Sequence, residues 1–238
     1  MNSSERWFLD EKRIWGLLVL IVLFSFGMNT YAKDTLENEA ENTSIVPFEK
    51  LQTLFPDVPI KEDGFVEGYE NNQLSVYSSD KKILDGMISS PVESYSAQYN
   101  GGLCTLNIYN NGQYGVVGYE KLDNVDRAGA GSEIYGSKYR SYYDLGGVGF
   151  FYTYTIYSSG SYSQFHNLSY PTGLLVDVNP YWNCTPGATG YVRQTQTASL
   201  PAEAYGWGYF SYMGGSGVGY KLITNVSYGN ISVSIQVS

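Results

Sequence analysis

A single histidine, His166, limits the catalytic chemistry that this chain could perform. One imidazole cannot build the zinc sites that use two or three histidine ligands. A Ser-His-Asp arrangement would need His166 as its base and either Ser163 or Ser169 as its nucleophile. Its orienting carboxylate would be Asp144 or Asp177. The Gly-x-Ser-x-Gly pattern that presents a nucleophilic serine does not occur, so His166 is better interpreted as a surface residue of a Ser-rich segment.

Carboxylates are the other candidates for acid–base chemistry, because a glycosidase needs two of them facing one another across a groove. The C-terminal two thirds of the chain offers Glu93, Glu120, Asp123, Asp126, Glu133, Asp144, Asp177 and Glu203. Their spacing selects no pair. Asp123 and Asp126 could offer oxygens to calcium, but the twelve-residue ligand pattern is missing. The glycine-rich run 214–219 matches neither phosphate-binding glycine motif, and we expect neither a metal nor a cofactor.

Two aromatic clusters remain as a candidate ligand-binding site. Tyr181 and Trp182 lie in one, Tyr205 and Trp207 in the other, and these are the only tryptophans after the N-terminal 32 residues. Each stands beside Gly, Pro or Asn, which keep a ring accessible. Flat aromatic faces with amides nearby suit stacking against the apolar face of a pyranose ring. The alternative is that the tryptophans fill the core.

The chain has two cysteines, Cys104 and Cys184, and we expect them to form a disulfide. An oxidising destination lets two thiols persist as a bridge. Strand alternation points Cys104 inward with Leu106 and Ile108. Closing a loop of about 80 residues would stabilise the fold by roughly 4.5 kcal/mol. Two separate, reduced and buried thiols are the alternative.

The elements that would position these residues are β-strands. From residue 73 to residue 238, short apolar and aromatic runs alternate with Gly, Asn, Ser and Pro, with no helical period, which predicts an all-β domain. About eight strands favour an antiparallel β-sandwich, with a jelly roll as one form of it. A hairpin is predicted around Asn110, Asn111 and Gly112, and the alternation over 230–238 predicts a half-buried strand. Further strands are predicted over 148–157, 174–178, 191–197, 206–212 and 218–224.

The N-terminal part has a different character. Lys12 and Arg13 precede an uncharged apolar run over 14–28, and Thr30 and Ala32 fit the small-residue positions of a cleavage site. Residues 1–32 are therefore predicted to be a signal peptide, with an uncleaved signal anchor at 14–28 as the alternative. Residues 33–72 form an acidic linker, in which apolar residues at helical spacing over 48–55 predict one short helix.

Composition then bounds the function. A net charge of −9 without a basic cluster excludes a nucleic-acid partner. A Tyr-, Ser-, Gly- and Asn-rich surface favours a secreted or cell-surface recognition module, with an extracellular ligand that could be carbohydrate and membrane contact only through an uncleaved leader. The first alternative is a secreted membrane-active protein, because aromatic and hydroxyl residues mix over 150–163 as in a barrel-forming hairpin. The second is an extracellular hydrolase with paired carboxylates.

We predict that the exported protein begins at Lys33, because the apolar run is short and Thr30 and Ala32 suit the peptidase. N-terminal sequencing of protein from the producing cells tests this. An intact Met1 on membrane-bound protein would instead support the signal anchor, and an intact Met1 in the cytosol would contradict export.

Overall fold

The computed structural model describes residues 45–68, 90–127, 134–145, 148–159, 162–175, 182–212 and 217–237. Within these ranges the chain forms one helix and eleven strands. They are, in order, α2 (Phe48–Leu54), β1 (Glu93–Tyr99), β2 (Gly102–Ile108), β3 (Tyr114–Arg127), β4 (Ile134–Leu145), β5 (Val148–Ser159), β6 (Tyr162–His166), β7 (Thr172–Leu175), β8 (Trp182–Arg193), β9 (Ala202–Tyr212), β10 (Gly217–Ser227) and β11 (Asn230–Val237). No helix of the described part is long and apolar enough to cross a membrane. The predicted leader and its cleavage site lie outside the described residues.

The strands form two antiparallel sheets. The seven-stranded sheet has the order β1-β2-β3-β4-β5-β6, and β7 pairs with the first residues of β5. The four-stranded sheet has the order β11-β10-β9-β8. The all-β prediction is therefore confirmed. The jelly-roll form is wrong, because a jelly roll is built from Greek keys, whereas here strands consecutive in sequence are mostly neighbours in a sheet.

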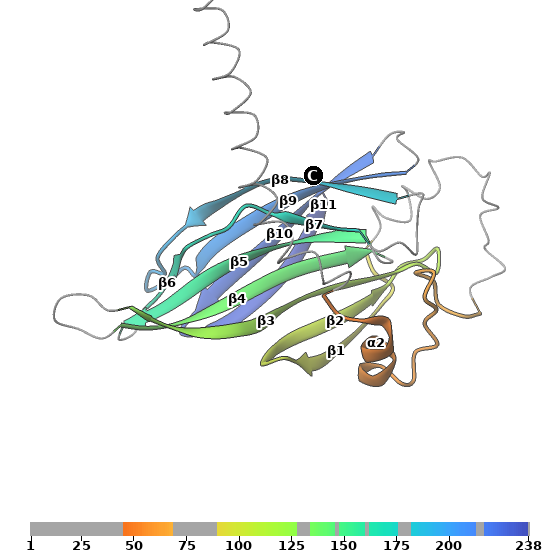
Figure 1. The fold of residues 1–238 in the computed structure, drawn as a ribbon, viewed down its shortest axis with the longest axis horizontal. Helices are drawn as coiled ribbons and strands as arrows, with labels where there is room; N and C mark the ends of the chain where they lie inside the picture. Colours follow the sequence, from red (N-terminus) through yellow and green to blue (C-terminus); the bar gives the residue numbers. More distant parts are fainter. Residues whose placement is uncertain are drawn as a thin grey trace, which may run out of the picture. The chain divides into compact units, whose positions relative to one another are not determined.

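The two sheets share one buried cluster. It includes Phe150, Tyr152 and Tyr154 of β5 and, from the other sheet, Phe210 and Tyr220, all of them nearly inaccessible to solvent. Figure 1 shows the sheets as two layers, with β9 and β10 behind β4 and β5. The arrangement is sandwich-like, and its core is built from aromatic rings more than from aliphatic side chains.

Glycines on β9 make room for the rings of β5. A Cβ placed on Gly208 would lie 2.3 Å from Cδ1 of Phe150, and a Cβ on Gly206 would lie 2.5 Å from Cδ1 of Tyr152. Both distances are too short for real atoms. The two rings therefore occupy the space that side chains at these positions of β9 would need. Only glycine at these two positions lets β9 pack this closely against β5.

Hydroxyl groups connect the sheets inside this core. Thr224 Oγ1 on β10 lies 2.6 Å from Tyr152 Oη on β5 and 2.8 Å from Ser141 Oγ on β4. Ser141 Oγ also lies 3.0 Å from Tyr154 Oη. A buried hydroxyl is costly without a hydrogen bond. Because these groups form hydrogen bonds with one another between the sheets, the hydroxyls of Tyr152 and Tyr154 can be buried without this cost.

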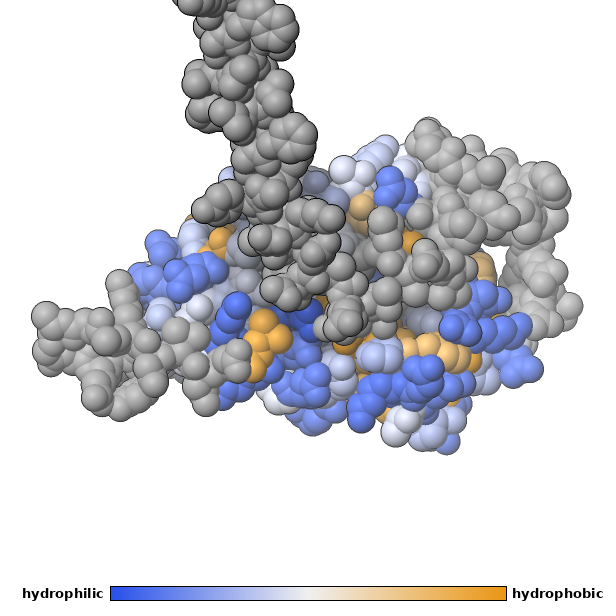
Figure 2. All heavy atoms as spheres, viewed as in Figure 1, coloured by the Kyte–Doolittle hydropathy of each residue, from blue (hydrophilic) through white to orange (hydrophobic). Residues whose placement is uncertain are grey.

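Part of the opposite face of the seven-stranded sheet is covered by residues 45–68. Leu51 and Phe55 belong to a second buried cluster with Cys104 and Leu106 of β2. The predicted helix is confirmed as α2, which lies beside β1 and β2 in Figure 1. The coloured part of the surface seen from this side is mostly hydrophilic, with small apolar patches (Figure 2).

Several predicted strands are confirmed and others were missed. β2 and β3 form the predicted hairpin, with Gly112 at a φ of 80°, and β11 is the predicted last strand. The strands predicted over 148–157, 206–212 and 218–224 lie within β5, β9 and β10. The strand predicted over 191–197 is mostly wrong, because β8 ends at Arg193. The pattern gave no signal for β1, β4 or β6.

We predict that Gly208→Val lowers the free energy of unfolding by about 1–3 kcal/mol, the usual cost of overpacking a core. The new side chain would overlap the Phe150 ring. Urea denaturation measures the change. Thr185→Val is the control, since it adds the same side chain at an exposed position of β8. A Gly208→Val protein as stable as this control would contradict the packing described above.

Candidate functional site

The structure brings only part of the predicted ligand-binding set together. Tyr205 and Trp207 both lie on β9, at alternate positions of the strand. Trp182 begins β8 and pairs with Tyr212 at the end of β9, whereas Trp207 pairs with Lys221 of β10. The two tryptophans therefore do not form a neighbouring pair in the sheet. Tyr181 lies outside the described residues.

The outward side of β9 carries three aromatic residues in line. Alternation sends Ala204 and Phe210 into the core, and Tyr205, Trp207 and Tyr209 to the other side. Tyr205 and Trp207 are half-buried and Tyr209 is 47% exposed. We call these three residues the aromatic row. Tyr209 was missed by the sequence analysis, although the period of two in Tyr-Gly-Trp-Gly-Tyr could have indicated it.

Glycines on the neighbouring strands lie next to the row. A Cβ on Gly190 of β8 would lie 2.7 Å from Oη of Tyr205, and a Cβ on Gly217 of β10 would lie 2.7 Å from Cε1 of Tyr209. These two rings therefore extend over positions that have no side chain. The Tyr205 and Tyr209 rings can therefore lie close to the backbone of the neighbouring strands. This favours a flat outer surface on the sheet.

Lys221 is a charged group in contact with the row. Its Nζ lies 4.6 Å from the ring centroid of Tyr205, within the range of a cation–π interaction. This contact restrains the orientation of the Tyr205 ring. The four strands of this sheet contain just three charged residues, Arg193, Glu203 and Lys221, and Arg193 pairs with Glu203 in the ladder. The surface around the row is therefore nearly neutral and rich in hydroxyl and amide groups.

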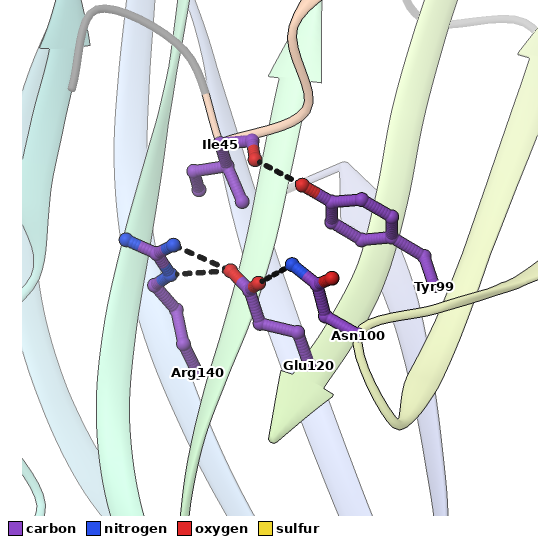
Figure 3. A network of polar contacts seen from close by, with 5 residues as sticks. All are labelled: Ile45, Tyr99, Asn100, Glu120 and Arg140. Carbon is purple, nitrogen blue, oxygen red and sulfur yellow. Dashed lines mark hydrogen bonds and ion pairs between the residues drawn. The ribbon is translucent and has the colours of Figure 1, made fainter. Parts of the chain in front are cut away.

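The most buried carboxylate of the described residues is already engaged (Figure 3). Glu120 of β3 is 3% exposed, and its Oε1 accepts a 2.7 Å hydrogen bond from Nε of Arg140 on β4. Its Oε2 accepts a 2.9 Å hydrogen bond from the side-chain amide of Asn100. The Arg140 guanidinium also lies 5.1 Å from the ring centroid of Phe151. Glu120 thus ties the turn between β1 and β2 to β4, and this arrangement leaves it poorly suited to proton transfer.

The same corner of the sheet holds the start of the N-terminal segment. Tyr99, which precedes Asn100, donates a 3.1 Å hydrogen bond from its hydroxyl to the carbonyl oxygen of Ile45 (Figure 3). Burial raises the pKa of Tyr99, and the negative charge of Glu120 raises it further. The hydroxyl therefore keeps its proton and remains a donor. We interpret this network as structural.

The remaining candidates for acid–base chemistry are dispersed. Glu93 Oε2 accepts a 2.6 Å hydrogen bond from the Tyr95 hydroxyl. The side chains of Asp123 and Asp126 are not described, and Glu133 and Asp177 lie outside the described residues. Where side chains are described, no cluster of three or more His, Cys, Asp or Glu residues could hold a metal ion.

The hypothetical triad around His166 finds no support in the geometry. His166 packs edge-on to Tyr157, with ring centroids 4.9 Å apart. Ser163 is buried, and its Oγ accepts a 3.0 Å hydrogen bond from the backbone N–H of Gly229. Ser163 and His166 differ by an odd number of positions along β6, so they face opposite sides of the sheet. Ser169 Oγ accepts a 2.9 Å hydrogen bond from the backbone N–H of Thr153.

The predicted disulfide is wrong in this structure. Cys104 and Cys184 are both free and buried. Cys104 lies in the cluster beneath residues 45–68, with its thiol beside the Tyr142 hydroxyl, whereas Cys184 lies in the cluster between the sheets. The seven-stranded sheet separates these clusters, so the two sulfurs cannot meet without rearrangement of the fold.

Comparison of the chain with protein-family models, with curated proteins and with solved structures found no significant match. Of the surfaces described above, the aromatic row is the one that presents several aromatic rings together on the outward side of a sheet.

We predict two unreactive thiols in the folded protein and two reactive thiols after denaturation without reductant. Burial raises the pKa of Cys104 to about 12 and that of Cys184 to about 12. At pH 8 both thus stay protonated in the native state, whereas an exposed thiol has a pKa of about 8.5. Iodoacetamide labelling followed by mass spectrometry counts them. A species that alkylates only after reduction would contradict the structure and restore the disulfide.

Proposed function

We propose that the β domain is a non-catalytic recognition module that acts outside the cytoplasm and binds a glycan on the aromatic row. The observation that carries this proposal is the alignment of Tyr205, Trp207 and Tyr209 along the outward side of one strand, with Gly190 and Gly217 beside them. Rings that lie low against a sheet offer their faces to a flat apolar ligand surface. Pyranose rings present such a surface, with hydroxyls at the edge for amide and hydroxyl partners.

The shape and charge of this surface favour an extended, neutral polysaccharide. Residues along a strand advance by about 3.3 Å each, so the Cα atoms of Tyr205 and Tyr209 are about 13 Å apart. That length spans more than one sugar unit. With three charged residues on the four strands, the sheet provides no cluster of cations for uronate or sulfate groups. Binding should therefore depend little on ionic strength.

The other two functions have less support. In the membrane-active alternative, the segment 150–163 would leave the domain, yet Phe150, Tyr152 and Tyr154 fill the centre of the core. Its release would expose that core to water. In the hydrolase alternative, two carboxylates would share a groove, yet Glu120 is committed to Arg140 and Asn100. The recognition module requires neither rearrangement.

We predict that Trp207→Ala weakens binding to an insoluble neutral polysaccharide such as cellulose or chitin by about thirtyfold or more, the loss typical of a central aromatic contact. Stability should fall by less than about 1 kcal/mol, because Trp207 lies on the outward side of the sheet. Pull-down isotherms and urea denaturation measure both quantities. Tyr170→Ala is the control, since Tyr170 is 83% exposed and lies outside the row.

Two results would contradict the proposal. A wild-type protein that binds no polysaccharide in a panel of neutral and anionic polymers would exclude the glycan as ligand. A loss of about 3–5 kcal/mol on Trp207→Ala would show instead that this ring is part of the core.

A further inference from the structure

The last strand forms an open edge of the four-stranded sheet. Among the described residues, β11 pairs with β10 along its full length and with no strand on its other side. Such an edge presents a row of backbone N–H and C=O groups that can pair with another strand. Ile231, Val233 and Ile235 pack against the core, which holds β11 extended and in a fixed register.

The opposite edge of the same sheet is protected against pairing. β8 contains Pro186, which has no N–H to donate, and its register with β9 shifts at two places. It also ends in a charged residue, Arg193. Proline, bulges and charge are the devices that proteins use to block edge-to-edge association. β11 has none of them, since its eight residues include no proline and no charged side chain, and its register is regular.

The edges of the seven-stranded sheet are less suited to pairing. β6 and β7 follow one another along the same edge of β5 and have only five and four residues. β1 begins with the exposed charged residue Glu93, and its other end, at Tyr99, is tied to the N-terminal segment through Ile45. β11 is therefore the longest unprotected edge in the described part of the chain.

We propose that β11 pairs antiparallel with β11 of a second copy of this chain, about a two-fold axis. The sequence of the strand is self-complementary in that arrangement. With Ser234 on the axis, Ser232 lies opposite Gln236 of the other copy, which matches polar residues on the outward side. On the inward side, Val233 lies opposite Ile235 and Ile231 opposite Val237. Val237 is 42% exposed in the single chain, and the pairing gives it an apolar neighbour.

The lack of charge on β11 allows a second copy to approach at this edge. The whole chain carries a net charge of −9, so two copies repel one another at most other approaches. The antiparallel pairing uses the one complete strand of this sheet that has no ionisable side chain. No like charges on the two β11 strands therefore repel one another where the strands meet. Closed two-fold pairing also consumes the edge, so association stops at a dimer.

Sedimentation velocity of the full chain, in the form that its cells produce, tests the proposal. The wild type should show a reversible monomer–dimer equilibrium. Ser234→Lys places two ammonium groups side by side at the axis, and since such contacts are strongly unfavourable, the dissociation constant should rise by about a hundredfold or more. Asn225→Lys is the control. It adds the same charge on β10, directly opposite Ser232 and one strand away from the edge, and should leave the equilibrium unchanged.

Crosslinking checks the geometry independently. Residues on the axis have Cα atoms about 4.5–5.5 Å apart, within the range of a disulfide. Ser234→Cys should therefore give a covalent dimer on mild oxidation, whereas Asn225→Cys should not. The native thiols do not interfere, because both are buried. A wild type that stays monomeric at all concentrations would overturn the proposal, as would a dimer that Ser234→Lys leaves intact.

Discussion

The packing of β5 rings against β9 glycines determines much of what the domain presents to solvent. Gly206 and Gly208 face the core because Tyr152 and Phe150 occupy the space beside them. The residues between and around these glycines must then face outward, and they are Tyr205, Trp207 and Tyr209. One short sequence, Tyr-Gly-Trp-Gly-Tyr, thus closes the core with its small residues and builds the aromatic row with its large ones. The stability of the domain and its candidate binding surface are properties of the same strand.

The seven-stranded sheet depends on cover from both sides. The four-stranded sheet buries one face, and residues 45–68 bury part of the other. Glu120 is acceptable in such a place because a guanidinium and an amide satisfy its oxygens. Between the sheets, the buried hydroxyls around Thr224 likewise satisfy one another by hydrogen bonding. In both cases the polar group bonds to two other segments, so its removal would affect more than one strand.

This double cover also explains how far the sequence could predict the fold. The hairpin at Gly112 and the last strand were predictable, because positive φ needs glycine there and β11 alternates between a core face and a wet face. β4 was not, because Tyr142 and Tyr143 are both fully buried although they are adjacent. A strand with cover on both faces loses the period of two. The disulfide prediction failed for a related reason, since alternation places Cys104 inward without saying towards which of two clusters.

The candidate site itself stays a prediction, but part of its geometry could be read from the sequence. Tyr205 and Trp207 were chosen because their flanking glycines favour accessible rings, and the same pattern contained Tyr209. The pairing of Trp182 with Trp207 was not decidable from composition, because it depends on the register between β8 and β9. That register contains two shifts, and local sequence gives no signal for where a bulge interrupts a ladder.

The absence of a bridge between Cys104 and Cys184 changes what the domain needs from its surroundings. A covalent link would have tied folding to an oxidising compartment and to the enzymes that make and rearrange such links. Here the two thiols are free, so the fold of the described residues does not depend on the formation of a disulfide. A thiol reductant such as glutathione should therefore leave the stability of this fold unchanged, since there is no bridge for it to break.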